Sequence, residues 1–164
     1  MKTIHRTILL AAFAMWFGGF GFYVSIVVPI GTDVLGSAIE QSVITRQVTV
    51  WINVFNAIVL VPMLIESVVT WNRSGAVRRW LQLVMVVIIA GGLVVLLIVH
   101  PILDAMFDEA NVAVSDSGRF YNMHRIYLWT STVQWIAAWA WLPLVVFGWQ
   151  RNPGWAGSEA APVG

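Results

Sequence analysis

Four long apolar runs constrain the fold of this chain more than any other feature of its sequence. Each is at least as long as the roughly 20 residues that a helix needs to cross the hydrocarbon of a bilayer. Because backbone polar groups cannot stay unpaired in lipid, such runs must be helices. The sequence therefore predicts an all-α, polytopic integral membrane four-helix bundle in residues 1–150, with a disordered tail at 151–164 and spans at about 7–29, 47–70, 80–100 and 124–149.

The composition agrees with lipid as the main solvent. Hydrophobic residues make up 59% of the chain and charged residues 10%, against about 25% charged in soluble proteins. The net charge of +1 gives no support for nucleic-acid binding. The chain has no Cys, which excludes disulfides, thiolate metal sites, iron–sulfur clusters and cysteine nucleophiles.

The first apolar run allows an alternative reading as a cleaved signal peptide. It follows Lys2 and Arg6, and the sequence Ala-Phe-Ala at 12–14 is similar to a cleavage site. The apolar stretch before that point is short, however, and the run continues to Ile30. We therefore expect it to be retained as a membrane span.

The distribution of basic residues predicts the orientation of the bundle. Six of the nine Lys and Arg lie at the N-terminus, in the 71–79 connection and in the tail: Lys2, Arg6, Arg73, Arg78, Arg79 and Arg151. Positive residues near spans favour the cytoplasmic side. We expect both termini in the cytoplasm (N-in, C-in) and, as the membrane, the bacterial inner membrane.

Small residues follow one face of the first span at steps of three and four. Faces of this kind let helix backbones approach closely in lipid. We interpret this face as a packing seam, with a ligand groove as the alternative; its members are Ala11, Ala14, Gly18, Gly21 and Ser25.

Polar residues follow one face of the second span and one face of the fourth. Gln134 lies ten residues after His124, which is about 15 Å deeper along a helix. Buried amides in lipid need partners, so both faces should point into the bundle. They form either interhelical hydrogen bonds or a ligand or ion niche, made of Tyr23, Asn53, Asn56, Tyr127, Ser131 and Gln134.

The third span is mainly aliphatic, and we expect it to face lipid or a partner. It ends at His100, where Pro101 should help to terminate the helix. Glu66 is the one acidic residue inside a span, and we expect it to reach the inner surface and pair with nearby arginines; a proton-carrying role is the alternative. His5 should be solvated and separate.

Two histidines should meet the same rim, because His100 ends the third span and His124 begins the fourth, antiparallel one. Together with Asp104 and Met123 they form a candidate metal site. Imidazole with thioether suits copper, and imidazole with carboxylate suits zinc or another divalent ion. The alternatives are plain interface residues, ligands of a haem or quinone, or a pH sensor.

Two stretches carry a resemblance to a known group of proteins. "WFGGFGFYVSIVVPIG" in the first span and "RFYNMHRIYLWTSTVQW" at the fourth resemble the copper-resistance-D-like and related uncharacterised four-span membrane proteins. The likeness covers about a third of the chain, and the stretch 31–49 has no counterpart. The resemblance implies a metal-linked role at His124, and rests on Trp16, Gly18, Gly19, Phe22, Pro29, Phe120, His124, Ser131 and Gln134.

These features together favour a non-enzymatic integral membrane protein with a polar and histidine site at its extracytoplasmic rim. We expect it to act as an accessory or binding subunit of a larger membrane complex. The alternatives are a copper-type metal-handling protein or small transporter, and a haem- or quinone-linked redox protein. The expected partners are the lipid bilayer and other membrane subunits or a second copy; the possible cofactor is copper or another divalent metal, with haem less favoured.

Overall fold

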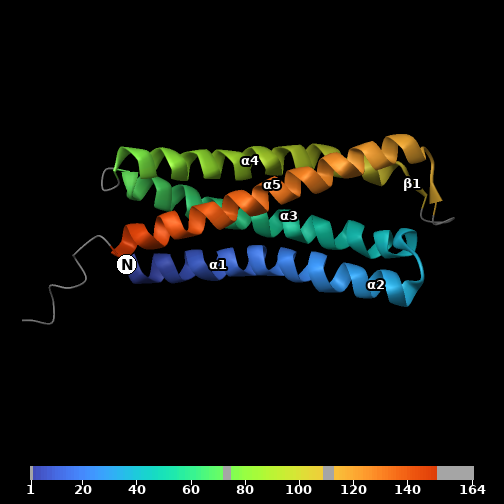
Figure 1. Ribbon diagram of the computed structural model, residues 1–164, viewed down its shortest axis with the longest axis horizontal. Coiled ribbons are helices and arrows are strands. Elements are labelled where there is room, and N and C mark those ends of the chain that lie inside the picture. The colour runs from blue at the N-terminus through green and yellow to red at the C-terminus, as the bar shows by residue number, and fades with distance from the viewer. Residues whose placement is uncertain (1, 72–74, 109–112, 151–164) are drawn as a thin grey trace, which may run out of the picture.

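Four long helices run antiparallel to one another in the computed structural model (Figure 1). The structure describes residues 2–71, 75–108 and 113–150. Each long helix has the length and hydropathy needed to cross a membrane, so the predicted mainly helical fold with four helices able to span a membrane is confirmed. The elements are α1 (Lys2–Phe22), η1 (Tyr23–Val27), α2 (Val28–Leu35), α3 (Ala38–Val69), α4 (Ala76–Ala105), β1 (Phe107–Asp108), β2 (Ala113–Val114) and α5 (Ser117–Gln150).

The bundle has two distinct ends (Figure 1). The start of α1 and the end of α5 lie together at what we call the termini end. The end of α2 and the antiparallel pair β1–β2 lie at the opposite, hairpin end. Both described chain ends are therefore on one side, as an even number of crossings requires; that this side is the cytoplasm stays a prediction from charge.

The helices extend beyond the predicted spans, and the predicted connection at 30–46 is wrong. Only Gly36 and Ser37 separate α2 from α3. Gly36 takes the left-handed conformation (φ 84°) and its N–H bonds to Thr32 O at 3.0 Å, while Ser37 Oγ accepts from the N–H of Glu40 at 3.1 Å. A glycine stop and a serine cap thus make a tight turn. Hydropathy could not reveal it, because hydropathy marks the edge of the hydrocarbon and not the end of a helix.

Pro101 does not end α4, which continues to Ala105. A proline removes one backbone hydrogen bond and displaces one carbonyl. Here side chains hold the following turn in place: His100 Nδ1 lies 3.2 Å from Asp104 Oδ2, and Arg46 Nε lies 2.8 Å from Asp104 Oδ1. α3 and α5 likewise contain an internal proline.

The first span changes its helical register before it ends. The π-helical turn η1 joins α1 to α2, and the wider turn rotates the residues that follow it. Tyr23, the first residue of this turn, is buried and donates its hydroxyl proton to Thr45 Oγ1 of α3 at 2.9 Å. This contact joins the first span to the second near the hairpin end.

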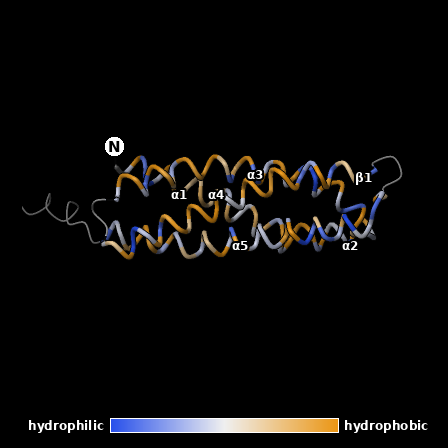
Figure 2. The backbone as a smooth tube through the Cα atoms, turned by 90° about the horizontal axis from the view of Figure 1, so that it is seen from above, coloured by the Kyte–Doolittle hydropathy of each residue, from blue (hydrophilic) through white to orange (hydrophobic). Residues whose placement is uncertain are grey.

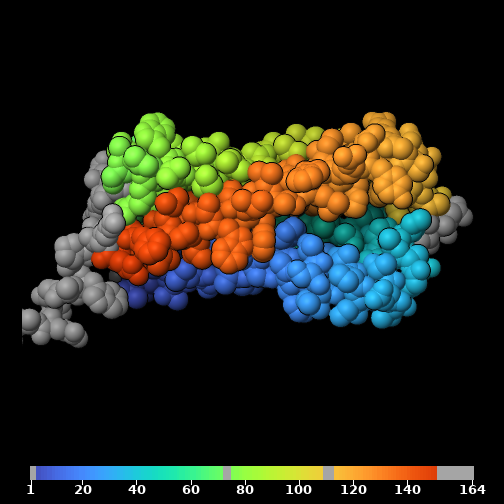
Figure 3. Space-filling model, viewed as in Figure 1, coloured from blue at the N-terminus to red at the C-terminus, as the bar shows by residue number. Residues whose placement is uncertain are grey.

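α5 crosses the bundle from α4 at the hairpin end toward α1 at the termini end (Figures 1 and 3). Along this path its aromatic residues stack on α1: Phe17 on Trp135 at 4.9 Å and Phe13 on Trp141 at 6.0 Å between ring centroids. A dry core fills the termini half, where Trp141, Val59 and Met63 are 0% exposed. Hydrophobic residues also cover much of the outer length of the helices (Figure 2), consistent with contact with lipid.

Two packing predictions fail within this chain. The small-residue face of α1 points outward: Ala11, Ala14, Gly18 and Ser25 are exposed, and Gly21 is half-buried beside Trp135. The buried face of α1 consists instead of Leu9, Phe13 and Trp16, since the large rings gain more dispersion contact than small residues can. The third span does not face outward more than the first two spans either, because a regular face of α4 is buried against α3 and α5: Gln82, Val86, Ile89, Leu93, Leu96 and Val99.

Candidate functional site

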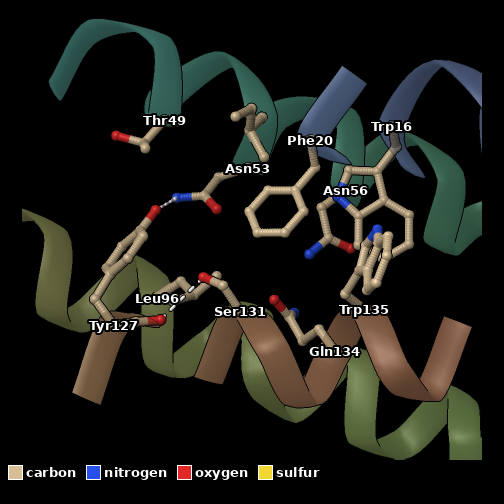
Figure 4. Close-up of a pocket in the computed structure, with 11 residues that line it drawn as sticks. Trp16, Phe20, Thr49, Asn53, Asn56, Leu96, Tyr127, Ser131, Gln134 and Trp135 are labelled. Atoms are coloured by element: carbon tan, nitrogen blue, oxygen red, sulfur yellow. Dashed lines mark hydrogen bonds between the residues drawn. The ribbon is translucent and has the colours of Figure 1, made fainter. Parts of the chain in front are cut away.

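Polar side chains of α3 and α5 converge on a small internal cavity between the middle of the bundle and the hairpin end (Figure 4). Its volume is about 20 Å³, enough for about one water molecule. Four aromatic residues line it: Trp16 and Phe20 from α1, and Tyr127 and Trp135 from α5. The full lining is Trp16, Phe20, Thr49, Ile52, Asn53, Asn56, Leu96, Tyr127, Ser131, Gln134 and Trp135.

The cavity brings together most of the polar niche predicted from the sequence. Asn53, Asn56, Tyr127, Ser131 and Gln134 all line it. Tyr23 does not belong to this lining; its hydroxyl bonds to Thr45 nearer the hairpin end.

Hydrogen bonds fix the orientation of the lining groups. Asn53 Nδ2 donates to Tyr127 Oη at 3.0 Å, Ser131 Oγ donates to Tyr127 O at 2.9 Å, and Gln134 Nε2 donates to Ile89 O at 2.7 Å. The carbonyl oxygens Asn53 Oδ1 and Asn56 Oδ1 are buried and have no hydrogen-bond partner among the described residues. Unpaired acceptors in a low-dielectric interior are costly, so these two oxygens are the unusual feature of the site.

A second network at the rim continues into the cavity. Asp104 joins Arg46 to His100, whose other ring nitrogen, Nε2, lies 3.2 Å from Arg46 O and 3.3 Å from Thr49 Oγ1. Thr49 is also part of the cavity lining, and the His100 ring meets the Tyr127 ring edge-on at 6.3 Å between centroids. Polar contacts therefore extend from the exposed rim to the cavity.

The four predicted metal-site residues do not form one cluster. The structure pairs His100 with Asp104, whereas His124 stacks on Phe120 at 5.8 Å between centroids. Met123 packs beside the apolar group around Tyr127. Within residues 2–71, 75–108 and 113–150, no group of three or more His, Asp or Glu side chains is placed to hold a metal ion.

The physical reason is the rotation of α5. Both histidines are at the hairpin end, as predicted, but Tyr127, three residues after His124, takes the position beside His100. The metal site therefore stays a prediction, because the structure does not bring its four residues together as ligands.

The buried carboxylate of Glu66 lies at the termini end, on the side that the sequence predicted, but its partners differ from the predicted ones. Glu66 is 3% exposed and points inward, with Oε2 3.1 Å from His5 Nε2 and Oε1 accepting from Trp149 Nε1 at 2.6 Å. Two of the expected arginine partners lie elsewhere: Arg79 stacks over Trp71 and Arg78 lies beside Gly148. The third, Arg73, is outside the described residues.

His5 is accordingly not a separate, solvated residue; its side chain is only 29% exposed. The topology of the bundle could have predicted that His5 and Glu66 lie near each other. The start of the first span, the end of the second and the end of the fourth must share one side of an antiparallel bundle, which brings together residues far apart in sequence.

Comparison with models of protein families, with curated proteins and with solved structures gave no match to this chain. Fold and site together define its class: a four-helix bundle able to cross a membrane, with a polar cavity inside and a buried carboxylate at one end.

Proposed function

We propose that this chain is a non-enzymatic integral membrane protein that binds one small polar guest in its internal cavity and serves as a binding subunit of a larger membrane assembly. The observation that carries the proposal is the pair of buried oxygens, Asn53 Oδ1 and Asn56 Oδ1, that lack a partner in the described residues. Each unpaired acceptor costs about 1–3 kcal/mol. A guest that satisfies both would be bound for that reason.

The chemistry of the lining supports binding in preference to catalysis. The hydroxyl of Ser131 donates to the carbonyl of Tyr127, and that of Thr49 donates to the carbonyls of Thr45 and Arg46. Covalent catalysis needs a nucleophile that gives its proton to a base, and the Thr49 proton is directed to carbonyls although His100 Nε2 lies 3.3 Å away. The cavity of about 20 Å³ is also much too small for a haem or a quinone ring. We therefore place neither group in this cavity.

The outward small-residue face of α1 supports a role within an assembly. Ala11, Ala14 and Gly18 are exposed, and a Cβ added to Gly18 would meet nothing within 4 Å. Such faces favour close helix–helix contact in lipid. Another membrane subunit, or a second copy of this chain, would fit against it. With the predicted orientation, the cavity lies in the extracytoplasmic half of the bundle.

A single introduced cysteine tests whether small solutes reach the cavity. Because the chain has no native Cys, Ser131→Cys creates a unique thiol in the lining. We expect Ag⁺, an ion of roughly water size, to block this thiol in sealed vesicles, as counted by maleimide labelling after denaturation. The side from which Ag⁺ works also reports the orientation.

The matched control is Thr132→Cys, the neighbouring position, which is exposed on the outside of the bundle and would lie in hydrocarbon. It should stay unblocked. If Ser131→Cys is never blocked, or if both positions react alike, the cavity is not a solute site and the proposed function fails.

A further inference from the structure

Several hydrogen-bond donors of the cavity lining are already used within the protein. Asn53 Nδ2 bonds to Tyr127, Gln134 Nε2 bonds to Ile89 O, and the Ser131 proton bonds to Tyr127 O. Two acceptors of the lining, Asn53 Oδ1 and Asn56 Oδ1, have no partner among the described residues. Figure 4 shows the carbonyl end of Gln134 pointing toward Ser131 and Asn56, opposite Asn53.

The remaining lining favours a single positive charge. The rings of Trp16, Phe20 and Trp135 border the same space, and aromatic faces carry negative potential that attracts cations. Hard cations take oxygen ligands, including Asn and Gln carbonyls. The lining contains no carboxylate, so it offers no charge to balance a divalent ion.

The charge of the hairpin end also favours a cation. Among the described residues near this end, five carboxylates stand against three arginines: Asp33, Glu40, Asp104, Asp108 and Asp116 against Arg46, Arg119 and Arg125. A surface with excess negative charge raises the local concentration of cations. The polar contacts through Asp104, His100 and Thr49 lie between this surface and the cavity.

We propose that the cavity binds one small monovalent metal cation of the size of Na⁺, held by the side-chain oxygens of Asn53, Asn56, Gln134 and Ser131. The inference rests on the proposed binding function and names the class of guest. The ion fits a space for about one water. The site also lies near the middle of α3 and α5, the depth at which membrane transporters hold sodium with neutral oxygens.

Binding of ²²Na⁺ to the purified full-length protein in detergent tests the proposal. We expect saturable binding of one ion per chain, displaced by unlabelled NaCl and not by choline chloride. Asn56→Leu should weaken binding at least tenfold, because it removes a coordinating oxygen. The control Asn122→Leu removes an exposed amide and should bind as the wild type does.

A second pair of variants protects the test against simple misfolding. A Cβ at Gly92 would come within 2.5 Å of Gln134 Cγ, whereas a Cβ at Gly91 would meet nothing within 4 Å. Gly92→Ala therefore displaces Gln134 without removing any polar group, and it should weaken ²²Na⁺ binding. Gly91→Ala should not.

The outcomes separate this inference from the proposed function. Absence of saturable ²²Na⁺ binding to folded wild type, or unchanged binding in both Asn56→Leu and Gly92→Ala, overturns the cation site. If Ser131→Cys is nevertheless blocked by Ag⁺, the cavity remains an accessible site for a guest other than sodium. If that thiol is also inert, both proposals fall.

Discussion

The indole Nε1 of Trp149 donates a hydrogen bond to Glu66 Oε1 at 2.6 Å, while the other carboxylate oxygen lies 3.1 Å from His5 Nε2. One buried carboxylate thereby joins the first turns of α1, the end of α3 and the end of α5. Arg6 lies over the Trp149 ring at 4.8 Å and Arg78 lies beside Gly148, so both cationic side chains contact the end of α5.

Trp149→Phe should lower the free energy of unfolding by about 1–3 kcal/mol, because it keeps an aromatic ring but removes a donor to a buried carboxylate. Chemical unfolding in detergent micelles measures the change. Trp129→Phe is the control, since Trp129 on the same helix is 66% exposed and should change stability little. Equal effects of the two substitutions would contradict the assigned hydrogen bond.

His5→Ala should destabilise the bundle, and Glu66→Gln should reduce that loss when both are present. Without His5, one carboxylate oxygen of the buried Glu66 loses its partner, and a buried polar group without a partner is unfavourable. A glutamine still accepts from Trp149, and an amide costs less to leave partly unpaired than a carboxylate does. A double-mutant cycle on unfolding free energies measures the coupling; strictly additive effects would show that the pair does not interact.

Asp104→Ala should loosen the last turn of α4 beyond Pro101 with little loss of global stability. The side chains of Arg46 and Asp104 are 26% and 34% exposed, and ion pairs this exposed contribute about 0–1 kcal/mol to the free energy of unfolding. Hydrogen–deuterium exchange of residues 102–105 should speed up. The control Asp33→Ala, at an exposed position of α2, should leave that exchange unchanged. Unaltered exchange in Asp104→Ala would show that the last turn of α4 is stable without the Asp104 contacts.

Gly31→Ala should destabilise the contact between α2 and α3. An added Cβ would overlap the amide of Gln41, which is buried, and overpacking of this kind costs about 1–3 kcal/mol. Gly18→Ala is the matched control, with open space around the new Cβ, and should be neutral or stabilising by up to about 1 kcal/mol. Thermal unfolding compares the two, and a Gly31→Ala protein as stable as Gly18→Ala would refute the close approach.

The sequence could predict those features of the fold and site that depend on local periodicity. Apolar runs identify the four helices, and steps of three and four place Asn53 with Asn56 and Ser131 with Gln134 on single faces. Most of the polar part of the cavity lining was therefore anticipated, but Thr49 and the apolar and aromatic members were not. Which faces meet depends on how each helix is rotated about its axis. That rotation brings Tyr127, not His124, beside His100.

The errors at Glu66 and in the first span have related causes. The arginines considered for Glu66 are close in sequence, but His5, 61 positions away, is close in space. In the first span, three-dimensional packing favours the bulky rings of Phe13 and Trp16 over the small-residue face. Neither preference is encoded in the local pattern.

The dry layer of Val59, Met63 and Trp141 divides the interior, because Asn56 and Glu66 are ten residues apart on α3, about 15 Å along its axis. In a bilayer this apolar layer would separate the cavity from Glu66. A solute entering from the hairpin end would stop at this layer, and Glu66 would lie on its far side. One small bundle would thus keep two separate polar sites, each nearer to a different aqueous phase.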